Sequence, residues 1–504
     1  MKNVLWSWIG VVASIVTGLW LSPYIIRKLG NEGYGVWSLI FSFLEYYWLV
    51  DLGFRSATLK YSAHYRATGE DDKVNEVVNT GLAYSSVASA LLVIATLALA
   101  GYAHRFFQIS AAYQSVFATL IVMVGIAWAV GTVFSLLSGV VEGYQRFDLT
   151  SRVWISTTVL RTVGLVAVLA LGYKLKAMAA VAITALAFGY AYNYLNLREV
   201  FPAVHISFSR VKMPMFRRML GYGVHTSVAS VATQLLNQGG PLLVAHFLPT
   251  AFVGYFLLPV RLLRYSVDMV GKVGFVTGSN AAEMAARKEY DAVYKMGLYV
   301  NRYCYALFAP LALALSLYGT ELLRVWINPE FALNSGPIIP AIAISTTLGI
   351  AAQFNSSSIL FGLGKHRGYA YSLLIEAILS CAAIYVAVPR YGIAGAAWVT
   401  AAFLVLNRGL VTSWLFSRAV EQSFGAYLRG VYVRPTLAAI PAFLGAWWIK
   451  VHWLPGRNWI EVLGGMGLLA AIYYLVAFPV CVEKEHRSIP WRWVTEKFSP
   501  HPAV

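Results

Sequence analysis

Residues 77–101 read VVNTGLAYSSVASALLVIATLALAG, and no Asp, Glu, Lys or Arg interrupts them. A helix that crosses a lipid bilayer needs roughly 20 mainly apolar residues. This stretch is therefore predicted to be a transmembrane helix, and stretches of similar length and composition recur along the chain. On this criterion we predict about fourteen spans, at 4–24, 33–52, 77–101, 114–140, 153–172, 177–196, 221–246, 251–277, 298–319, 336–361, 368–388, 392–416, 434–451 and 459–480.

The composition is that of an all-α integral membrane protein. Of the 504 residues, 59% are hydrophobic and 12% are charged, and the mean hydropathy is +0.64. Soluble domains average about 45–50% apolar and about 25% charged residues, so the soluble-enzyme classes are largely excluded. The net charge of +17 comes mostly from residues between the apolar stretches. No basic domain lies outside them, so nucleic-acid binding is not expected.

Cysteine usage and the N-terminus add two expectations. Cys304, Cys381 and Cys481 lie far apart in apolar stretches, so neither a metal site nor a disulfide framework is predicted. Met1-Lys2-Asn3 leads directly into an apolar stretch that is too long for the core of a signal peptide, and we interpret it as the first span.

The distribution of positive charge predicts the orientation. Of the 39 lysines and arginines, 24 fall on the side of the N-terminus and nine on the opposite side. The positive-inside rule then places both termini in the cytoplasm. The outward loops are all short, the longest being about 320–335, so we expect the function to lie within the helical bundle.

Two short segments indicate an internal repeat. LGNEGYGVW (29–37) joins the first two predicted spans, and LPTAFVGYF (248–256) joins the seventh and eighth. When their first residues, Leu29 and Leu248, are aligned, Gly35 pairs with Gly254. Two positions later, the aromatic residues Trp37 and Phe256 also pair. This spacing predicts two six-helix lobes related by a parallel repeat, with a substrate site between them and alternating access. The predicted parts are 1–200, 201–430, an appended helix pair at 431–480, and a cytoplasmic tail at 481–504 to which no chemistry is assigned.

The predicted eighth span has an ionic face. Arg261, Arg264, Asp268 and Lys272 stand at i, i+3, i+7 and i+11. On a helix they occupy a sector of roughly 80°. Lipid does not accept such a face, and the surplus positive charge would attract anions into a wet cavity. The alternative is a structural ion-pair network with Glu45 or Glu376 on other helices.

Polar residues in other spans extend this candidate site. Arg161 lies in the middle of span 153–172 and cannot easily reach the membrane surface, whereas Arg302 and Arg408 lie near span ends, where long side chains snorkel. In span 221–246, a polar stripe is predicted either to line the same cavity or to form hydrogen bonds between helices. It includes Gln234, Asn237 and Gln238.

Acidic residues suggest a gate and a coupling site. Asp51 and Arg55 stand at i and i+4, a spacing that suits either a helix-end ion pair or a gate at the cytoplasmic mouth of the cavity. Glu45 and Glu376 are equal candidates to bind a coupling proton or cation, and with Asp51 and Asp268 they form the set of coupling or gating candidates.

Several stretches of the chain carry a family resemblance. Near the N-terminus, IIRKLGNEGYGVWSLI (25–40) is followed by DLGF (51–54). Later stretches are AFVGYFLLPVRLL (251–263), ILFGLGKHRGYAYSLLIEAILS (359–380) and VPRYGIAGAAWVTA (388–401). Together they resemble the bacterial polysaccharide exporters of the multidrug/oligosaccharidyl-lipid/polysaccharide flippase superfamily.

The resemblance implies a non-enzymatic flippase in the bacterial inner membrane, with two lobes around a cationic cavity. Its substrate would be a polyprenyl-pyrophosphate-linked oligosaccharide, moved from the inner to the outer leaflet for O-antigen, capsule or exopolysaccharide synthesis. Arg55, Arg261 and Arg264 match the family pattern for headgroup ligands, and Lys272 and Arg161 join them because of their charge. No cofactor is implied, and coupling would use membrane potential, a proton or Na⁺. Besides the bilayer and this glycan, the expected partners are a polysaccharide polymerase and its chain-length machinery.

Two other hypotheses remain open. A cation-coupled multidrug exporter of the same superfamily would need an acidic cavity, opposite in sign to the ionic face around Arg264. A membrane-embedded sugar polymerase or ligase would need catalytic groups on a substantial outward loop, and the predicted outward loops are too short for that.

Overall fold

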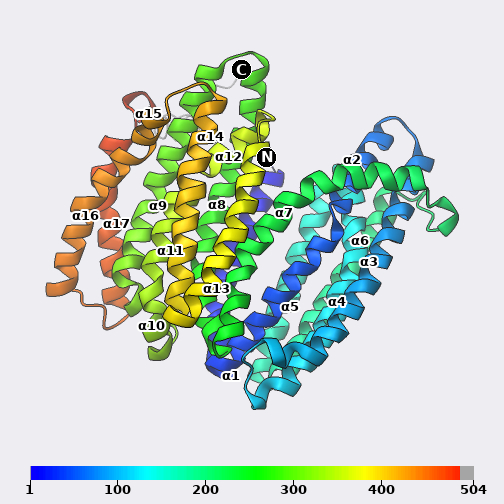
Figure 1. Cartoon of the computed structure of the whole chain (residues 1–504), viewed down its shortest axis with the longest axis horizontal. Coiled ribbons are helices and arrows are strands. Elements are labelled where there is room, and N and C mark those ends of the chain that lie inside the picture. Colours follow the sequence, from blue (N-terminus) through cyan, green and yellow to red (C-terminus); the bar gives the residue numbers. More distant parts are fainter. Residues whose placement is uncertain (1, 488–504) are drawn as a thin grey trace, which may run out of the picture. The chain divides into compact units, whose positions relative to one another are not determined.

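The computed structural model describes the backbone of residues 2–487 and most of their side chains, and within this range the chain is built from helices and connecting segments without strands. The described side chains are those of 17–103, 105–223, 230–264, 267–268, 270–271, 273–274 and 276–487. The chain forms two compact units, which we call unit 1 (Met1–Leu258 and Leu373–Ala396) and unit 2 (Pro259–Ser372 and Ala397–Val504). The all-helical class predicted from the sequence is confirmed (Figure 1).

The helices follow one another with short connections. The first part of the chain forms α1 (Lys2–Leu44), η1 (Glu45–Asp51), α2 (Phe54–Ala67), α3 (Asp71–Phe106), α4 (Ala111–Gly143), α5 (Phe147–Ala170), α6 (Leu175–Val200), η2 (Phe208–Arg210) and α7 (Met213–Phe247). The next part forms α8 (Ala251–Ala286), α9 (Tyr290–Trp326), α10 (Pro329–Ser335), η3 (Gly336–Ile338), α11 (Ile339–Ser345), η4 (Thr346–Ala351), α12 (Phe354–Gly362) and α13 (Arg367–Leu404). The last part forms η5 (Val405–Val411), α14 (Thr412–Ala419), α15 (Phe424–Leu428), η6 (Arg429–Val433), α16 (Arg434–His452), α17 (Trp459–Cys481) and η7 (Lys484–His486).

Eight helical segments within the described residues are long and apolar enough to cross a membrane. They are Asp71–Ala103, Ala111–Gly143, Phe147–Ala170, Leu175–Val200, Tyr290–Trp326, Pro329–Gly362, Arg367–Ala419 and Trp459–Cys481. The segment Arg367–Ala419 contains two of the predicted spans, whereas α7 and α8 are absent from this set and contain the polar stripe and the ionic face. The count of fourteen spans stays a prediction.

The compact units do not coincide with the predicted lobes, 1–200 and 201–430. Unit 1 also contains α7 and residues 373–396 of α13. The reason is packing, because α7 contacts α1, α2, α3 and η1. The predicted appended pair, 431–480, corresponds to α16 and α17, which lie side by side in unit 2 and pack on α9 (Figure 1).

Two helices are interrupted at glycines. Gly30 has φ 77° and ψ 172° inside α1, and Gly392 has φ 59° inside α13. These positions lie at or beside the predicted turns between spans, and positive φ is a conformation that glycine adopts without a steric penalty. A third break lies at the predicted end of span 33–52: Leu52 and Gly53 are both left-handed, and they end η1 before α2 begins. The residues 54–67, which lie between two predicted spans, form the helix α2.

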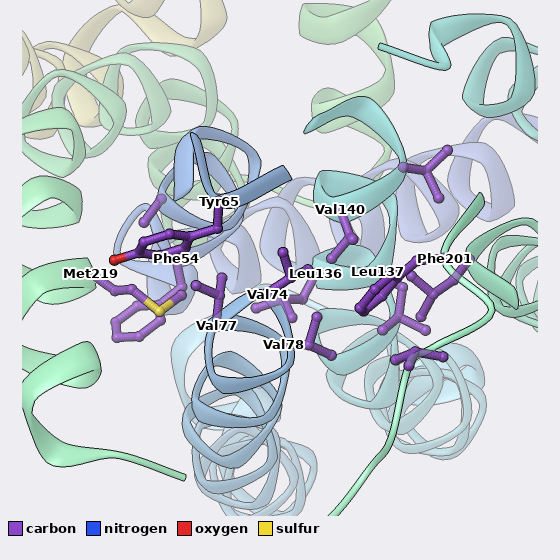
Figure 2. Packing of buried hydrophobic residues seen from close by; sticks show 14 of the residues in the cluster. Phe54, Tyr65, Val74, Val77, Val78, Leu136, Leu137, Val140, Phe201 and Met219 are labelled. Carbon is purple, nitrogen blue, oxygen red and sulfur yellow. The ribbon is translucent and has the colours of Figure 1, made fainter. Parts of the chain in front are cut away.

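The core of unit 1 joins α2, α3, α4 and α7. Figure 2 shows Phe54 and Met219 near Val77, with Leu136 and Val140 farther along the same apolar layer. All five side chains are essentially buried. This layer fixes the start of α2, which is where Arg55 lies.

The two segments of the predicted repeat touch each other within unit 1. A Cβ atom placed on Gly35 would overlap the carbonyl oxygen of Thr250, and one on Gly254 would lie 2.9 Å from the ring of Tyr34. The glycine pair picked out by the alignment is therefore a site of close backbone approach between α1 and the start of α8. The repeat itself stays a prediction.

Candidate functional site

Arg55 is held on α4. Its Nη2 atom lies 2.6 Å from Oε1 of Glu142, and its Nε donates to Oγ of Ser138 at 3.1 Å. The Arg55 side chain is 40% exposed, whereas that of Glu142 is only 13% exposed. A Cβ on Gly139 would lie 2.9 Å from the Arg55 carbonyl oxygen, so this glycine lets the two helices approach. The guanidinium therefore has a fixed anchor and an accessible edge.

Asp51 contacts Arg55 through the backbone rather than through the guanidinium. Its carboxylate oxygens accept the Arg55 backbone N–H at 3.3 and 3.2 Å. Asp51 thus stabilises the first turn of α2, where backbone N–H groups lack helical partners. The interpretation of these two residues as a side-chain ion pair is corrected: the ion pair of Arg55 is with Glu142. Sequence reasoning missed Glu142, which lies 87 residues away.

The predicted polar stripe on α7 contains two unsatisfied amides. Nε2 of Gln234 and Oε1 of Gln238 are buried and, among the described residues, form no hydrogen bond. Asn237 on the same helix has polar interactions. Buried polar atoms normally bind a protein group or an ordered water. One donor and one acceptor, a helical turn apart, therefore need a water molecule or a ligand.

The two candidate coupling carboxylates have different environments. Glu45 is half-buried at the start of η1, whereas Glu376 on α13 is only 4% exposed. Both have polar or electrostatic interactions. The α13 segment is close to α7, because a Cβ on Gly239 would lie 2.6 Å from Sγ of Cys381. Glu376 therefore belongs to a helix packed against the α7 stripe.

Arg161 lies on α5 in unit 1. It occupies an exposed position in the middle of α5 and, within the side chains that the structure describes, has no ion-pair partner. Its role as a headgroup ligand stays a prediction.

The ionic face of unit 2 lies on the continuous helix α8. Nε of Arg264 is 4.0 Å from Oδ1 of Asp268, and their side chains are 53% and 52% exposed. Arg261 is half-buried, and the side chain of Lys272 lies outside the described residues. Both Arg264 and Asp268 are too exposed to belong to the core of unit 2, and such exposure is what binding to water or to a ligand requires.

A second ionic group in unit 2 was not foreseen. Arg302 is 5% exposed, donates from Nε to the Gly430 carbonyl at 2.5 Å, and pairs through Nη1 with Oε1 of Glu483 at 2.7 Å. Arg434 contacts the same carboxylate oxygen at 2.7 Å. Hydrogen bonds from these guanidinium groups, first from Arg302, hold the pKa of Glu483 below its ordinary value of 4.5. The predicted tail, 481–504, therefore begins with an anchor, and its residues 488–504 lie outside the described range.

Unit 2 also contains a buried cluster of uncharged polar side chains. Asn301 donates from Nδ2 to Oγ of Ser356 at 2.8 Å and to the Tyr427 hydroxyl at 2.7 Å. Gln353 accepts from both hydroxyls and donates to Tyr432 at 3.1 Å. The cluster lies beside the π-helical segments η4 and η6, and it holds α9 against them.

The chain is similar to proteins connected with polysaccharide synthesis and to a solved flippase structure. A family model described as polysaccharide biosynthesis protein matches residues 1–270. The putative O-antigen transporter of Shigella flexneri is 20% identical over 420 residues, which covers 83% of this chain and 98% of the relative. The uncharacterized membrane protein EpsK of Bacillus subtilis is 19% identical over 495 residues, 94% of each chain. The solved structure of the lipid II flippase MurJ in its inward closed conformation is 13% identical, with a TM-score of 0.72, and covers 97% of this chain and 99% of that one.

Proposed function

Because the chain belongs to the polysaccharide biosynthesis protein family, whose model matches residues 1–270, we propose that it is a flippase for a lipid-linked oligosaccharide. The substrate is a polyprenyl-pyrophosphate-linked glycan, which the protein moves from the inner to the outer leaflet of a bacterial inner membrane by alternating access. The protein performs no covalent chemistry on it. Both termini lie in the cytoplasm, and a polysaccharide polymerase with its chain-length machinery acts on the product.

The observation that carries the proposal is the exposed basic face of α8. Arg261 and Arg264 stand one helical turn apart, the face contains these two arginines and one aspartate, Asp268, and the side chains of Arg264 and Asp268 are about half exposed. Guanidinium groups bind phosphate oxygens through two parallel hydrogen bonds, which an ammonium group cannot do. A pyrophosphate carries negative charge that suits this surplus, whereas a cationic drug would be repelled. The sign of the charge thus favours the glycolipid over the multidrug alternative.

Unit 1 supplies complementary groups. The accessible edge of Arg55 can bind a phosphate while Glu142 and Ser138 hold the rest of its guanidinium. The unsatisfied amides of Gln234 and Gln238 can donate to and accept from sugar hydroxyls. Glu45 and Glu376 are the proposed sites for a coupling proton or cation.

The first experiment tests Arg264 in cells that depend on this protein for surface polysaccharide. Arg264→Ala should stop transport, so that the oligosaccharide-linked lipid accumulates and stays shielded from reagents outside the cell. Arg264→Lys should restore transport only in part, because it keeps the charge without the planar donor pair. The readout is mass spectrometry of polyprenyl-linked lipids, which also identifies the glycan.

Arg287→Ala is the matched control, because Arg287 is an exposed arginine at the end of the same helix, paired with Glu283 at 2.5 Å. It should transport like the wild type. Equal membrane levels of all variants exclude a defect in insertion. Normal transport by Arg264→Ala would overturn the role of the α8 face. An unchanged lipid pool after depletion of the protein, in a host without a paralogue, would favour the drug exporter.

A further inference from the structure

An open apolar groove runs between α5 and α6 in unit 1. Its volume is about 310 Å³, and it is lined mainly by small or aliphatic side chains. The lining residues include Leu160, Gly164 and Val168 on α5 and Ala177, Ala180 and Thr184 on α6. Both helices are long and apolar enough to cross a membrane, and most of α5 is exposed on the outside of unit 1. The groove therefore opens where hydrocarbon chains can enter.

Close packing of the two helices forms the floor of the groove. A Cβ on Gly164 would lie 2.6 Å from Cγ1 of Val181, so the Val181 side chain packs directly against the α5 backbone there. The α6 side of the groove is shallow, because the side chains of Ala177 and Ala180 are small. The result is a narrow channel along the helix crossing rather than a wide pocket.

The length of the groove is comparable to one leaflet. Its lining on α5 runs from Leu160 to Val168. At a rise of 1.5 Å per residue this distance is about 12 Å, slightly less than half of a hydrocarbon core that is about 30 Å thick. Tyr173, which is 60% exposed, stands at the outer end of the groove, at the level where tyrosines gather at membrane–water interfaces.

Two lysines stand at the same end. Lys174 is the extended residue that directly follows Tyr173 and precedes α6, and Lys176 lies one helical turn before Ala180 on α6. Both are exposed, and neither is paired with a carboxylate among the described residues. An apolar channel of one-leaflet length with two cations at its mouth matches a phospholipid that carries a negative charge.

We propose that this groove binds one anionic phospholipid, with an acyl chain between α5 and α6 and its phosphate at Lys174 and Lys176. Anionic headgroups gain interaction energy with basic residues at the membrane surface, which zwitterionic headgroups lack. A polyprenyl chain would extend much farther beyond the inner end of the channel at Leu160 than an acyl chain.

The test uses the full-length protein in nanodiscs that contain equal amounts of dioleoyl phosphatidylglycerol and dioleoyl phosphatidylcholine. Native mass spectrometry counts the lipids that the released protein retains. We expect one phosphatidylglycerol in preference to phosphatidylcholine. Replacing both lysines (Lys174→Gln with Lys176→Gln) should reduce this preference by about fivefold for each lysine lost. The control Lys28→Gln with Arg105→Gln removes two exposed cations elsewhere and should leave it unchanged.

A second pair of variants tests the channel. Ala180→Phe places a ring in the groove and should abolish retention of the lipid, whereas Ala187→Phe places one at an exposed position two turns farther along α6 and should not. Equal retention of both lipids by the wild type would overturn the proposal. So would unchanged phosphatidylglycerol retention in the double lysine variant or in Ala180→Phe, or displacement of the bound lipid by a polyprenyl phosphate.

Discussion

Arg55 illustrates how a single charged side chain can be both anchored and available in this protein. Its Nη2 is fixed by Glu142 and its Nε by Ser138, yet 40% of the side chain is exposed. A fixed guanidinium loses less conformational freedom when it binds a ligand, and this improves affinity without any new contact. Mutation of the anchoring residue Glu142 and mutation of Arg55 itself should therefore have different effects.

We expect Glu142→Gln to cost stability but to preserve transport. Loss of this partly exposed ion pair should lower the free energy of unfolding by about 1 kcal/mol or less. Arg55→Ala should instead abolish transport, because it removes the proposed phosphate ligand. Thermal unfolding of the purified protein, together with complementation of surface polysaccharide synthesis, measures the two effects. Complete loss of transport in Glu142→Gln would show that the ion pair itself is the functional unit.

The sequence was informative about Arg55 but not about its partner. The spacing of Asp51 and Arg55 predicts that they are neighbours at a helix end. The hydrogen bond from the Arg55 backbone N–H to the Asp51 carboxylate confirms this. It could not show that Leu52 and Gly53 are left-handed, which turns the Arg55 side chain toward α4. The contact between α2 and α4 depends on close packing at Gly139. The sequence pattern alone does not show which helices pack against each other at this glycine.

At the scale of helices, unit 2 depends on its buried polar cluster. Asn301, Ser356 and Tyr427 are fully buried and are joined by hydrogen bonds of 2.7–2.8 Å. Among the described residues, only Oδ1 of Asn301 in this group of three lacks a partner. Buried hydrogen-bonded clusters restrict the arrangement of helices, because a shift leaves more buried polar atoms without partners. The cluster thus fixes α9 relative to η6 in the adjoining part of unit 2.

Tyr427→Phe should destabilise the protein more than Tyr473→Phe. Both tyrosines are fully buried, but the Tyr427 hydroxyl bonds with three side chains, whereas that of Tyr473 makes one 3.4 Å contact with the Pro435 carbonyl. Leaving buried polar groups unsatisfied costs about 1–3 kcal/mol. Unfolding midpoints of the two variants, measured in the same detergent, give the comparison. Equal losses would mean that the cluster contributes packing only.

Sequence patterns predicted the helices better than their interruptions. The turns near Gly30 and Gly392 follow from Gly-rich motifs, and the structure confirms both. The cluster around Tyr427 could not be predicted, because its members come from helices more than 50 residues apart and each one alone looks like an ordinary polar residue in a span.

On the scale of the whole molecule, the end of the described chain secures unit 2. Glu483 bridges Arg302 on α9 and Arg434 on α16, and the Tyr303 hydroxyl lies 2.7 Å from Nδ1 of His486. The unforeseen anchor therefore joins segments that are far apart in sequence. The composition predicted a membrane-embedded helical protein, but the division into two units depends on long-range packing of α7 that composition does not reveal.

Acid should loosen this anchor. The pKa of Glu483 is lower in the folded protein than its ordinary value of 4.5, so the folded state binds this proton more weakly than the unfolded state. The stabilisation is fully present above pH 4.5 and is lost as the pH falls through the lower folded value. Limited proteolysis after α17 should therefore become faster at acidic pH in the wild type. In Glu483→Gln, proteolysis after α17 should be fast at all pH values. An identical pH dependence in the wild type and in this variant would contradict the role of Glu483 as the acid-sensitive group.

The position of Glu483 also constrains how the protein is made. Arg302 meets this carboxylate only after another 181 residues have been added to the chain. At about 5–20 residues per second, synthesis of that length takes about 10–40 s. During that interval the guanidinium of Arg302 lacks this carboxylate. A chain that ends before Glu483 would contain Arg302 and Arg434 without the residue that joins them.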